Sequence, residues 1–219
     1  MRRVSDSAFT SLTSYIESAP MDANHAIAHA DAAEYGLTAP SPALGNLLGT
    51  LAAGAGAAGS GATGAVAITP AAGVVGLHIL HGLPEKSTLT CIDPEADHQN
   101  RAKALFREAG YPTSRTRFLP SRPLDVLGRL ATQAYHVVYM DVEPVDLPAA
   151  IEAAWPLLSP GGTLVVVGSL LDGTIADPSR KDRDTLAARE ADEVVEGFEG
   201  AVVTRLPLDA GVTLVTRKG

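Results

Sequence analysis

The sequence predicts a doubly wound α/β fold built on a mostly parallel β-sheet. From residue 64 onward, short runs of β-branched and other apolar residues alternate with longer segments of helical pattern. Apolar runs such as 164–167 show no polar alternation, which is typical of strands covered on both faces. Such a sheet needs helices on both sides. We expect the 219 residues to form a single domain, 1–219.

Seven strands are expected, and the last two differ from the others in how they are connected. The expected strands are 65–68, 88–92, 116–119, 136–140, 163–167, 201–205 and 212–216. The expected helices of this part are 74–82, 95–109, 123–130, 147–157 and 180–196. Residues 206–211 are too few for a helical crossover, so the final two strands should pair antiparallel.

An N-terminal helical portion, residues 1–53, should precede the α/β core of residues 64–219. The helical patterns there cover 7–17, 24–35 and 42–53. The Gly- and Ala-rich stretch 54–64 should be a loop that leads into the first strand.

Composition excludes several classes of protein. The chain has 17 Lys and Arg against 25 Asp and Glu, a net charge of −8, which argues against a general binder of nucleic acid or anionic membranes. Cys91 is the single cysteine, so neither an internal disulfide nor a cysteine-based zinc cluster is expected, which fits a reducing compartment. The uncharged stretch 35–84 is interrupted throughout by Gly and Pro, so no membrane span is expected. No apolar run follows Met1, so we expect a cytoplasmic protein without a secretory signal.

One glycine motif is misleading. Residues 59–64 spell G-x-G-x-x-G, but they precede the first strand instead of following it. Their amides would therefore not face a pyrophosphate at a helix N-terminus. Ala65 stands where a phosphate-binding loop needs lysine, which also excludes that interpretation.

The turn after the first strand is a better candidate for ligand binding. Residues 69–76 are small, so a ligand can approach the backbone at the carboxyl end of the sheet. About twenty residues later Asp93 ends the second strand, where a carboxylate can accept both hydroxyls of a ribose. Asp93 is alternatively an N-cap for the helix near Glu95, with Pro94 at its first position, and the two roles are compatible.

Several motifs occur in an order that resembles one enzyme family. They are Thr38-Ala39-Pro40-Ser41-Pro42, the loop 69–76, Ile92-Asp93, Glu108-Ala109-Gly110, Tyr139-Met140-Asp141, the L-S-P-G-G turn 158–162 and L-P-L-D-A-G at 206–211. Together they resemble the S-adenosylmethionine-dependent O-methyltransferases of the catechol and caffeoyl-coenzyme A type, over about 24–217. The resemblance implies a class I, Rossmann-like methyltransferase fold, usually dimeric, with the cofactor over the carboxyl ends of the first strands.

The resemblance also implies which residues bind S-adenosylmethionine. The first-strand motif of the family falls on Ala67, Thr69, Pro70 and Gly73, so alanine replaces the carboxylate that usually faces the methionine part. Asp93 matches the carboxylate that binds the ribose. The remaining cofactor positions are Ser121, Arg122 and Pro123 on the adenine side, and Asp141.

The metal site of the family is incomplete in this sequence. Family members use a divalent cation that positions two oxygens of a catechol-like acceptor and favours deprotonation. Asp141 matches the first metal ligand and is the expected catalytic residue, whereas Gly168 and Ser169 occupy the other two positions. Pro144 replaces the lysine near the reacting hydroxyl. We therefore expect no tightly bound divalent metal. Two carboxylates are candidate replacement ligands, although solvated loop positions are the favoured interpretation of both: Glu143 and Asp172.

Histidines and basic residues are further candidate functional groups. His25 and His29 stand four apart on a predicted helix, but no third metal ligand is evident, so surface positions are favoured. His78 and His81 are expected to pack or cap. Seven basic residues are candidates for attracting an anionic substrate, with scattered solvated charges as the alternative: Arg101, Lys103, Arg107, Arg115, Arg117, Arg122 and Arg129.

The resemblance and its missing metal ligands thus imply an S-adenosylmethionine-dependent O-methyltransferase that transfers a methyl group to a hydroxyl of an unidentified small molecule without the usual metal of the family. Methyl transfer needs a nucleophile in line with the sulfonium methyl group, and positioning with a local base can suffice. The expected partners are a small-molecule acceptor of unidentified structure and a second copy of the chain in a homodimer, with no nucleic acid and no membrane. The alternative is a catalytically impaired family member that acts as a cofactor-binding or interaction protein.

Overall fold

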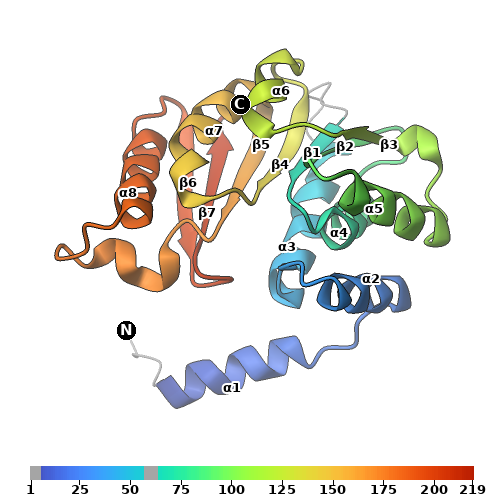
Figure 1. Ribbon diagram of the computed structural model, residues 1–219, viewed down its shortest axis with the longest axis horizontal. Helices are drawn as coiled ribbons and strands as arrows, with labels where there is room; N and C mark the ends of the chain where they lie inside the picture. The colour runs from blue at the N-terminus through green and yellow to red at the C-terminus, as the bar shows by residue number, and fades with distance from the viewer. Residues whose placement is uncertain (1–5, 57–63) are drawn as a thin grey trace.

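The computed structural model describes residues 6–56 and 64–219, and its centre is one seven-stranded sheet. The strand order is β3-β2-β1-β4-β5-β7-β6 (Figure 1). The first five strands run parallel, and β7 is antiparallel to both β5 and β6. These findings confirm the predicted fold class and the antiparallel final hairpin. The strands are β1 (Gly64–Ile68), β2 (Thr88–Ile92), β3 (Thr116–Leu119), β4 (Tyr135–Met140), β5 (Leu158–Val167), β6 (Ala201–Leu206) and β7 (Val212–Arg217).

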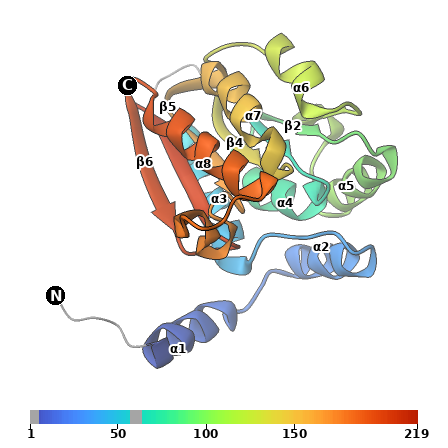
Figure 2. The same cartoon turned by 60° about the vertical axis from the view of Figure 1, so that its left-hand side comes forward.

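Helices cover both faces of this sheet (Figures 1 and 2). Because neighbouring side chains of a strand point to opposite faces, Ala65 and Ala67 of β1 pack into one core, and Val66 and Ile68 into the other. The first core is covered by α2 (Ala23–Glu34), α3 (Pro42–Ala53), α4 (Ala72–Gly82) and α5 (Ala96–Glu108). The second is covered by α6 (Pro123–Val126), α7 (Leu147–Ala154) and α8 (Arg183–Glu196).

Some elements begin or end differently from the sequence prediction. Strand β5 begins at Leu158, so the predicted turn 158–162 is part of the strand, where Gly161 supplies a φ of +76°. Helix α8 begins at Arg183 because the side chain of Asp182 caps it, accepting a hydrogen bond from the N–H of Thr185. The predicted helices 123–130 and 147–157 both pass into 3-10 turns before they end.

Two further segments depart from the expected order of elements. A 3-10 segment at Leu171–Ala176 follows β5, and the sequence analysis did not predict it. Of the loop expected at 54–64, Gly54–Gly56 form a 3-10 turn. Residues 57–63, which include most of the G-x-G-x-x-G stretch, lie outside the described residues.

Helix α1 (Asp6–Glu17) lies at the periphery of the molecule, below α2 in both Figure 1 and Figure 2, and contacts α3. Its large apolar side chains are exposed: Phe9, Leu12, Tyr15 and Ile16. An exposed apolar face of this kind is compatible with the expected homodimer, which stays a prediction. Within 6–56 and 64–219, none of the helices has both the length and the apolar character that crossing a bilayer requires.

The crossing of α3 and α4 depends on glycine. A Cβ atom on Gly82 would collide with the backbone carbonyl oxygen of Gly49, which cannot move as the tip of a flexible side chain can. A Cβ atom on Gly45 would collide with the imidazole of His78. The two helices can therefore approach closely only because these positions lack side chains.

The Gly82→Ala substitution should lower the free energy of unfolding by about 1–3 kcal/mol, because the added methyl group forces α3 away from α4. Urea denaturation of the two proteins measures the difference. Gly128→Ala is the matched control, since nothing lies within 4 Å of its added methyl group. If both variants were equally stable, close contact at Gly82 would not matter for folding.

Candidate functional site

Three polar residues follow directly after parallel strands and lie at one edge of the sheet. Thr69 follows β1, Asp93 follows β2 and Asp141 follows β4. The sheet hydrogen bonds continue past the strands, since the N–H of Thr69 donates to Ile92 O at 3.3 Å and that of Asp141 to Ile68 O at 2.9 Å. β1 lies between β2 and β4, where the strand order changes direction, which is the common ligand site of open α/β sheets.

A cavity of about 460 Å³ opens at this edge of the sheet. Its volume lies in the range of small-molecule and cofactor sites. The structure brings six of the predicted site residues together in its wall: Thr69, Pro70, Asp93, Arg122, Pro123 and Asp141.

Ala67, Gly73 and Ser121, predicted for the same site, do not line this cavity. Ala67 is fully buried and faces the core under α4, because it precedes Ile68 on the strand and points the opposite way. Gly73 belongs to α4, where a Cβ atom would press on Leu105 of α5, so it serves helix packing. Ser121 lies in the turn after β3. The structure thus places Ala67 outside this cavity, and its role toward the cofactor stays a prediction.

Asp93 is buried, yet both of its carboxylate oxygens have partners. Its Oδ2 atom lies 2.6 Å from Nδ1 of His98, and Oδ1 accepts the N–H of Glu95 at 3.1 Å. The side chain of Gln99 donates to the backbone carbonyl of Asp93 at 2.8 Å. A carboxylate offers about four acceptor positions, so Asp93 keeps capacity for the hydroxyls of a ligand. Its position is fixed before any ligand arrives.

The N-cap interpretation of Asp93 is wrong. The N-cap of α5 is Glu95, the helix starts at Ala96, and Pro94 precedes it. Asp93 instead binds the N–H two residues further on, as in an Asx turn. The sequence analysis did not predict the contact of His98 with Asp93. The observation that could have indicated it is that His98 lies in the first turn of the helix that follows Asp93.

Asp141 lines both the first cavity and a second one of about 470 Å³. Four residues line both cavities: Pro70, Asp141, Val142 and Glu143. The hydroxyl of Thr69 donates to Oδ2 of Asp141 at 3.0 Å. Burial raises the pKa of Asp141 above its ordinary value; the hydrogen bond from Thr69 opposes this rise and the charge of Glu143 adds to it. A carboxylate of this kind can accept a proton from a hydroxyl in either cavity.

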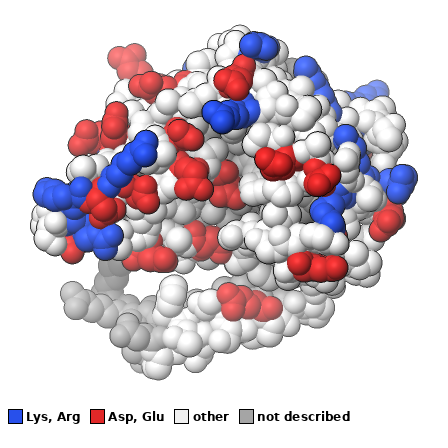
Figure 3. Space-filling view, viewed as in Figure 1, with Lys and Arg blue, Asp and Glu red and all other residues white. Residues whose placement is uncertain are grey.

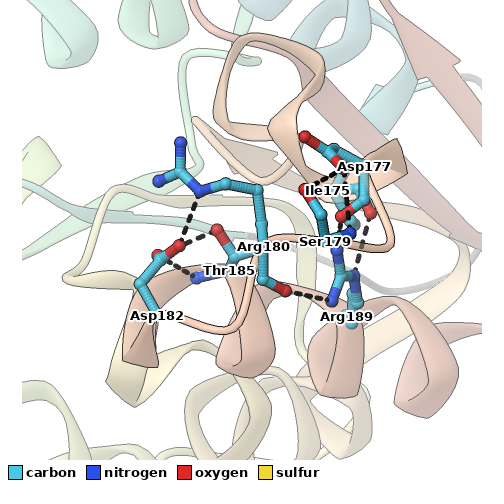
Figure 4. A network of polar contacts seen from close by, with 7 residues as sticks. All are labelled: Ile175, Asp177, Ser179, Arg180, Asp182, Thr185 and Arg189. Atoms are coloured by element: carbon cyan, nitrogen blue, oxygen red, sulfur yellow. Dashed lines mark hydrogen bonds and ion pairs between the residues drawn. The ribbon is translucent and has the colours of Figure 1, made fainter.

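The far wall of the second cavity includes Leu171 and Asp172. The segment that follows them is held by Arg189 of α8, as Figure 4 shows. Its guanidinium donates to the carbonyl oxygens of Ile175 at 2.9 Å and Arg180 at 3.0 Å, and also to that of Asp177. One side chain thus fixes the backbone next to this wall.

The resemblance matches Asp141, Gly168 and Ser169 to the three metal positions of the family, and this set would not suit a hard divalent cation. Gly168 offers no side-chain donor, and the hydroxyl of Ser169 is buried and bonded to that of Thr213 at 2.8 Å. Asp141 is then the single carboxylate at the three matched positions. Glu143 and Asp172 both line the second cavity. We assign no chemical step to a metal ion at this site.

The seven basic residues considered as a substrate-attracting group serve different purposes. Arg122 lines the first cavity. Arg101 pairs with Asp31 at 3.0 Å, and Arg115 donates to the carbonyl oxygens of Leu83 and Ser87. Figure 3 shows acidic side chains spread over much of this face, with basic ones mainly at its two sides. The arrangement favours the interpretation as scattered charges.

Comparison with known proteins identifies the family. A family model described as a methyltransferase domain matches residues 70–166. A protein of Mycolicibacterium vanbaalenii that carries the provisional name O-methyltransferase is 38% identical over 196 residues, which cover 90% of this chain and 84% of the relative. The chain belongs to the S-adenosylmethionine-dependent O-methyltransferases. This confirms the resemblance deduced from the sequence motifs.

Solved structures agree with this methyltransferase assignment. A crystal structure of a Corynebacterium glutamicum protein shares 60% identity, with a TM-score of 0.93 and coverage of 97% of this chain and 98% of that one. The O-methyltransferase TomG of Streptomyces achromogenes, involved in tomaymycin synthesis and crystallised with S-adenosylmethionine, shares 25% identity, with a TM-score of 0.80 and coverage of 95% and 96%.

In this methyltransferase, Asp141→Asn should increase stability at neutral pH. The raised pKa means that the folded protein holds the proton of Asp141 more firmly than the unfolded chain does. As the pH rises above about 3.8, the pKa of this carboxyl group in the unfolded chain, the unfolded state is favoured and the folded protein loses stability. Asparagine does not ionise, so the variant avoids that loss. Denaturant unfolding should give the variant a higher free energy of unfolding than the unmodified protein at pH 7, and the difference should shrink toward pH 3.

Asp125→Asn is the control, because Asp125 is an exposed carboxylate at the same cavity. Its stability should stay within about 0.5 kcal/mol of the unmodified protein at each pH. An equal increase in the free energy of unfolding of both variants would mean that the change in net charge, and not the burial of Asp141, causes the effect.

Proposed function

We propose that this protein transfers a methyl group from S-adenosylmethionine to a hydroxyl of a small molecule, without the metal used by other members of its family. The observation that carries the proposal is that Asp141 lines two neighbouring cavities. The first cavity has six of the nine predicted cofactor residues in its wall, and the second shares Asp141 with it. The TomG structure, with S-adenosylmethionine bound to a similar fold, supports the cofactor.

The first cavity offers suitable groups for each part of S-adenosylmethionine. Asp93 would accept the ribose hydroxyls, while Arg122 and Pro123 would lie on the adenine side. Helix α4 begins just after Pro70, and its N-cap residue Ala71 has no capping side chain. The helix N-terminus therefore favours the carboxylate of the methionine part. The cofactor supplies a methyl group on a positively charged sulfur, which is open to attack by an oxygen nucleophile.

The chain itself would orient the acceptor and remove its proton. Oδ2 of Asp141 is held by Thr69, so the carboxylate has a defined direction before the acceptor binds. Its raised pKa brings it closer to that of an effective general base. Apolar side chains of the second cavity would keep water away from the hydroxyl and align it with the methyl group: Val142, Leu147, Val167 and Leu171.

Asp93→Asn should weaken S-adenosylmethionine binding about 10–100-fold, because the charged acceptor of the ribose hydroxyls contributes roughly 1.5–3 kcal/mol. Calorimetric titration with the cofactor and with its demethylated product measures the change. Glu152→Gln removes an exposed carboxylate of α7 that does not line the cavity, and it should leave the affinity nearly unchanged. Unaltered binding by a correctly folded Asp93→Asn protein would disprove the ribose role.

Methyl transfer should survive chelation of divalent ions, because Gly168 and Ser169 supply no free donor beside Asp141. Transfer of a labelled methyl group to a panel of small phenols and alcohols, with and without excess chelator, tests this. Catechol should be a poor acceptor, since nothing holds both of its oxygens. Activity that chelation abolishes and magnesium restores would contradict the proposal and indicate Glu143 or Asp172 as replacement ligands.

The second candidate function is a cofactor-binding protein with impaired catalysis. The replacement of the family lysine by Pro144 and of two metal ligands by Gly168 and Ser169 favours it. Tight cofactor binding without transfer to any member of the acceptor panel would support this function over the first.

A further inference from the structure

A third cavity, of about 530 Å³, lies among the N-terminal helices. It opens where the start of α2 meets α3 and the C-terminal end of α4. It shares no lining residue with the two cavities at the sheet edge. Four of the residues in its wall are metal-ligand types: Asp22, His25, His78 and His81.

The fold brings histidines of two helices together at this cavity. The rings of His25 on α2 and His78 on α4 have their centroids 4.1 Å apart, and His81 lies 6.1 Å from His25. The sequence offered no third ligand for a site on α2. The packing of α4 against α2 supplies two candidates, His78 and His81, which are three apart and so lie on one helix face.

Two of these imidazoles are buried, and each has a ring nitrogen without a hydrogen-bond partner among the described residues. His25 is 9% exposed and His78 is 5% exposed. Nε2 of each has no hydrogen-bond partner in the part of the chain that the structure describes. A buried polar atom without a partner costs free energy, so Nε2 of His25 in the wall of this cavity indicates a missing ligand.

Asp22 prepares His25 for coordination. Its Oδ1 atom lies 3.3 Å from Nδ1 of His25, and it also accepts the N–H of Asn24 at 2.9 Å as the N-cap of α2. With the proton on Nδ1, the lone pair of His25 is on Nε2. A histidine that donates one ring nitrogen to a carboxylate and offers the other is the usual arrangement around zinc.

His78 reaches the same cavity from α4, with its ring packed between His25 of α2 and Gly45 of α3. Its Nε2 atom lies against Gly45 of α3, so Nδ1 is the nitrogen that can coordinate without moving the ring away from α3.

We propose that His25, His78 and His81 bind a transition-metal ion of the zinc type, with Asp22 orienting His25. In the conformation described for 6–56 and 64–219, no three such side chains are already arranged around an ion. The imidazoles must therefore turn about their side-chain torsions to share one. His81 is exposed and can do so at low cost, and the cavity leaves room for the ion and a water molecule. The ion would join α2 to α4.

The test is titration of the untagged, chelator-stripped full chain with Zn²⁺, followed by calorimetry and thermal unfolding. One Zn²⁺ per chain should bind and raise the melting temperature, whereas Mg²⁺, which prefers oxygen ligands, should do neither. Co²⁺ should produce the visible absorption of a nitrogen-ligated ion. Absence of saturable Zn²⁺ binding would overturn the proposal.

Substitutions distinguish Zn²⁺ binding at this site from non-specific Zn²⁺ binding by other histidines. His25→Gln and His81→Gln should each weaken Zn²⁺ binding by more than about tenfold, and Asp22→Asn by about tenfold or more. His29→Gln is the matched control: His29 lies one turn further along α2 and does not line the cavity, and although its ring centroid is 6.2 Å from that of His78, the proposal gives it no ligand role. It should bind Zn²⁺ like the unmodified protein.

Equal affinities of the His81→Gln and His29→Gln proteins would overturn the proposal. His81 is exposed, so this comparison remains decisive even if His25→Gln fails to fold. The readouts do not involve methyl transfer, and their result is therefore independent of the proposed enzymatic function.

Discussion

The alignment of β1, β2 and β4 is the constraint on which the candidate site depends. Thr69, Asp93 and Asp141 are far apart in the sequence and lie together because their strands end at the same edge. The hydrogen bonds from Thr69 N to Ile92 O and from Asp141 N to Ile68 O hold this register past the last strand residues. A shift of one residue would turn every strand side chain to the opposite face and separate these groups.

The main features of the fold followed from the sequence because buried parallel strands leave a clear pattern. The apolar runs marked all seven strands, and the positions after β2 and β4 indicated Asp93 and Asp141. The early start of β5 was missed because Pro160 and Gly161 normally interrupt strands. The contact of His98 with Asp93 depends on a side-chain torsion, which residue spacing does not define.

Other features depend on tertiary packing that no local pattern records. His25 and His78 are 53 positions apart, and their contact requires α2 to lie on α4. Close approach of α3 to α4 at glycines is part of the same arrangement. The prediction for Ala67 came from the motif resemblance, whereas the alternation of side chains along β1 turns Ala67 to the opposite face from Ile68, so it does not line the first cavity.

The position of β7 has a consequence for the order in which the sheet can form. β7 is the last strand in the sequence but lies between β5 and β6, and β6 pairs with it alone among the described strands. During synthesis β6 must wait outside the sheet until β7 has been made and inserted. The turn between them contributes Ala210 to the second cavity, and Asp209 accepts the N–H of Ser41 at 2.7 Å. A growing chain therefore acquires the wall of the second cavity last, and the same step ties its end to the beginning of α3.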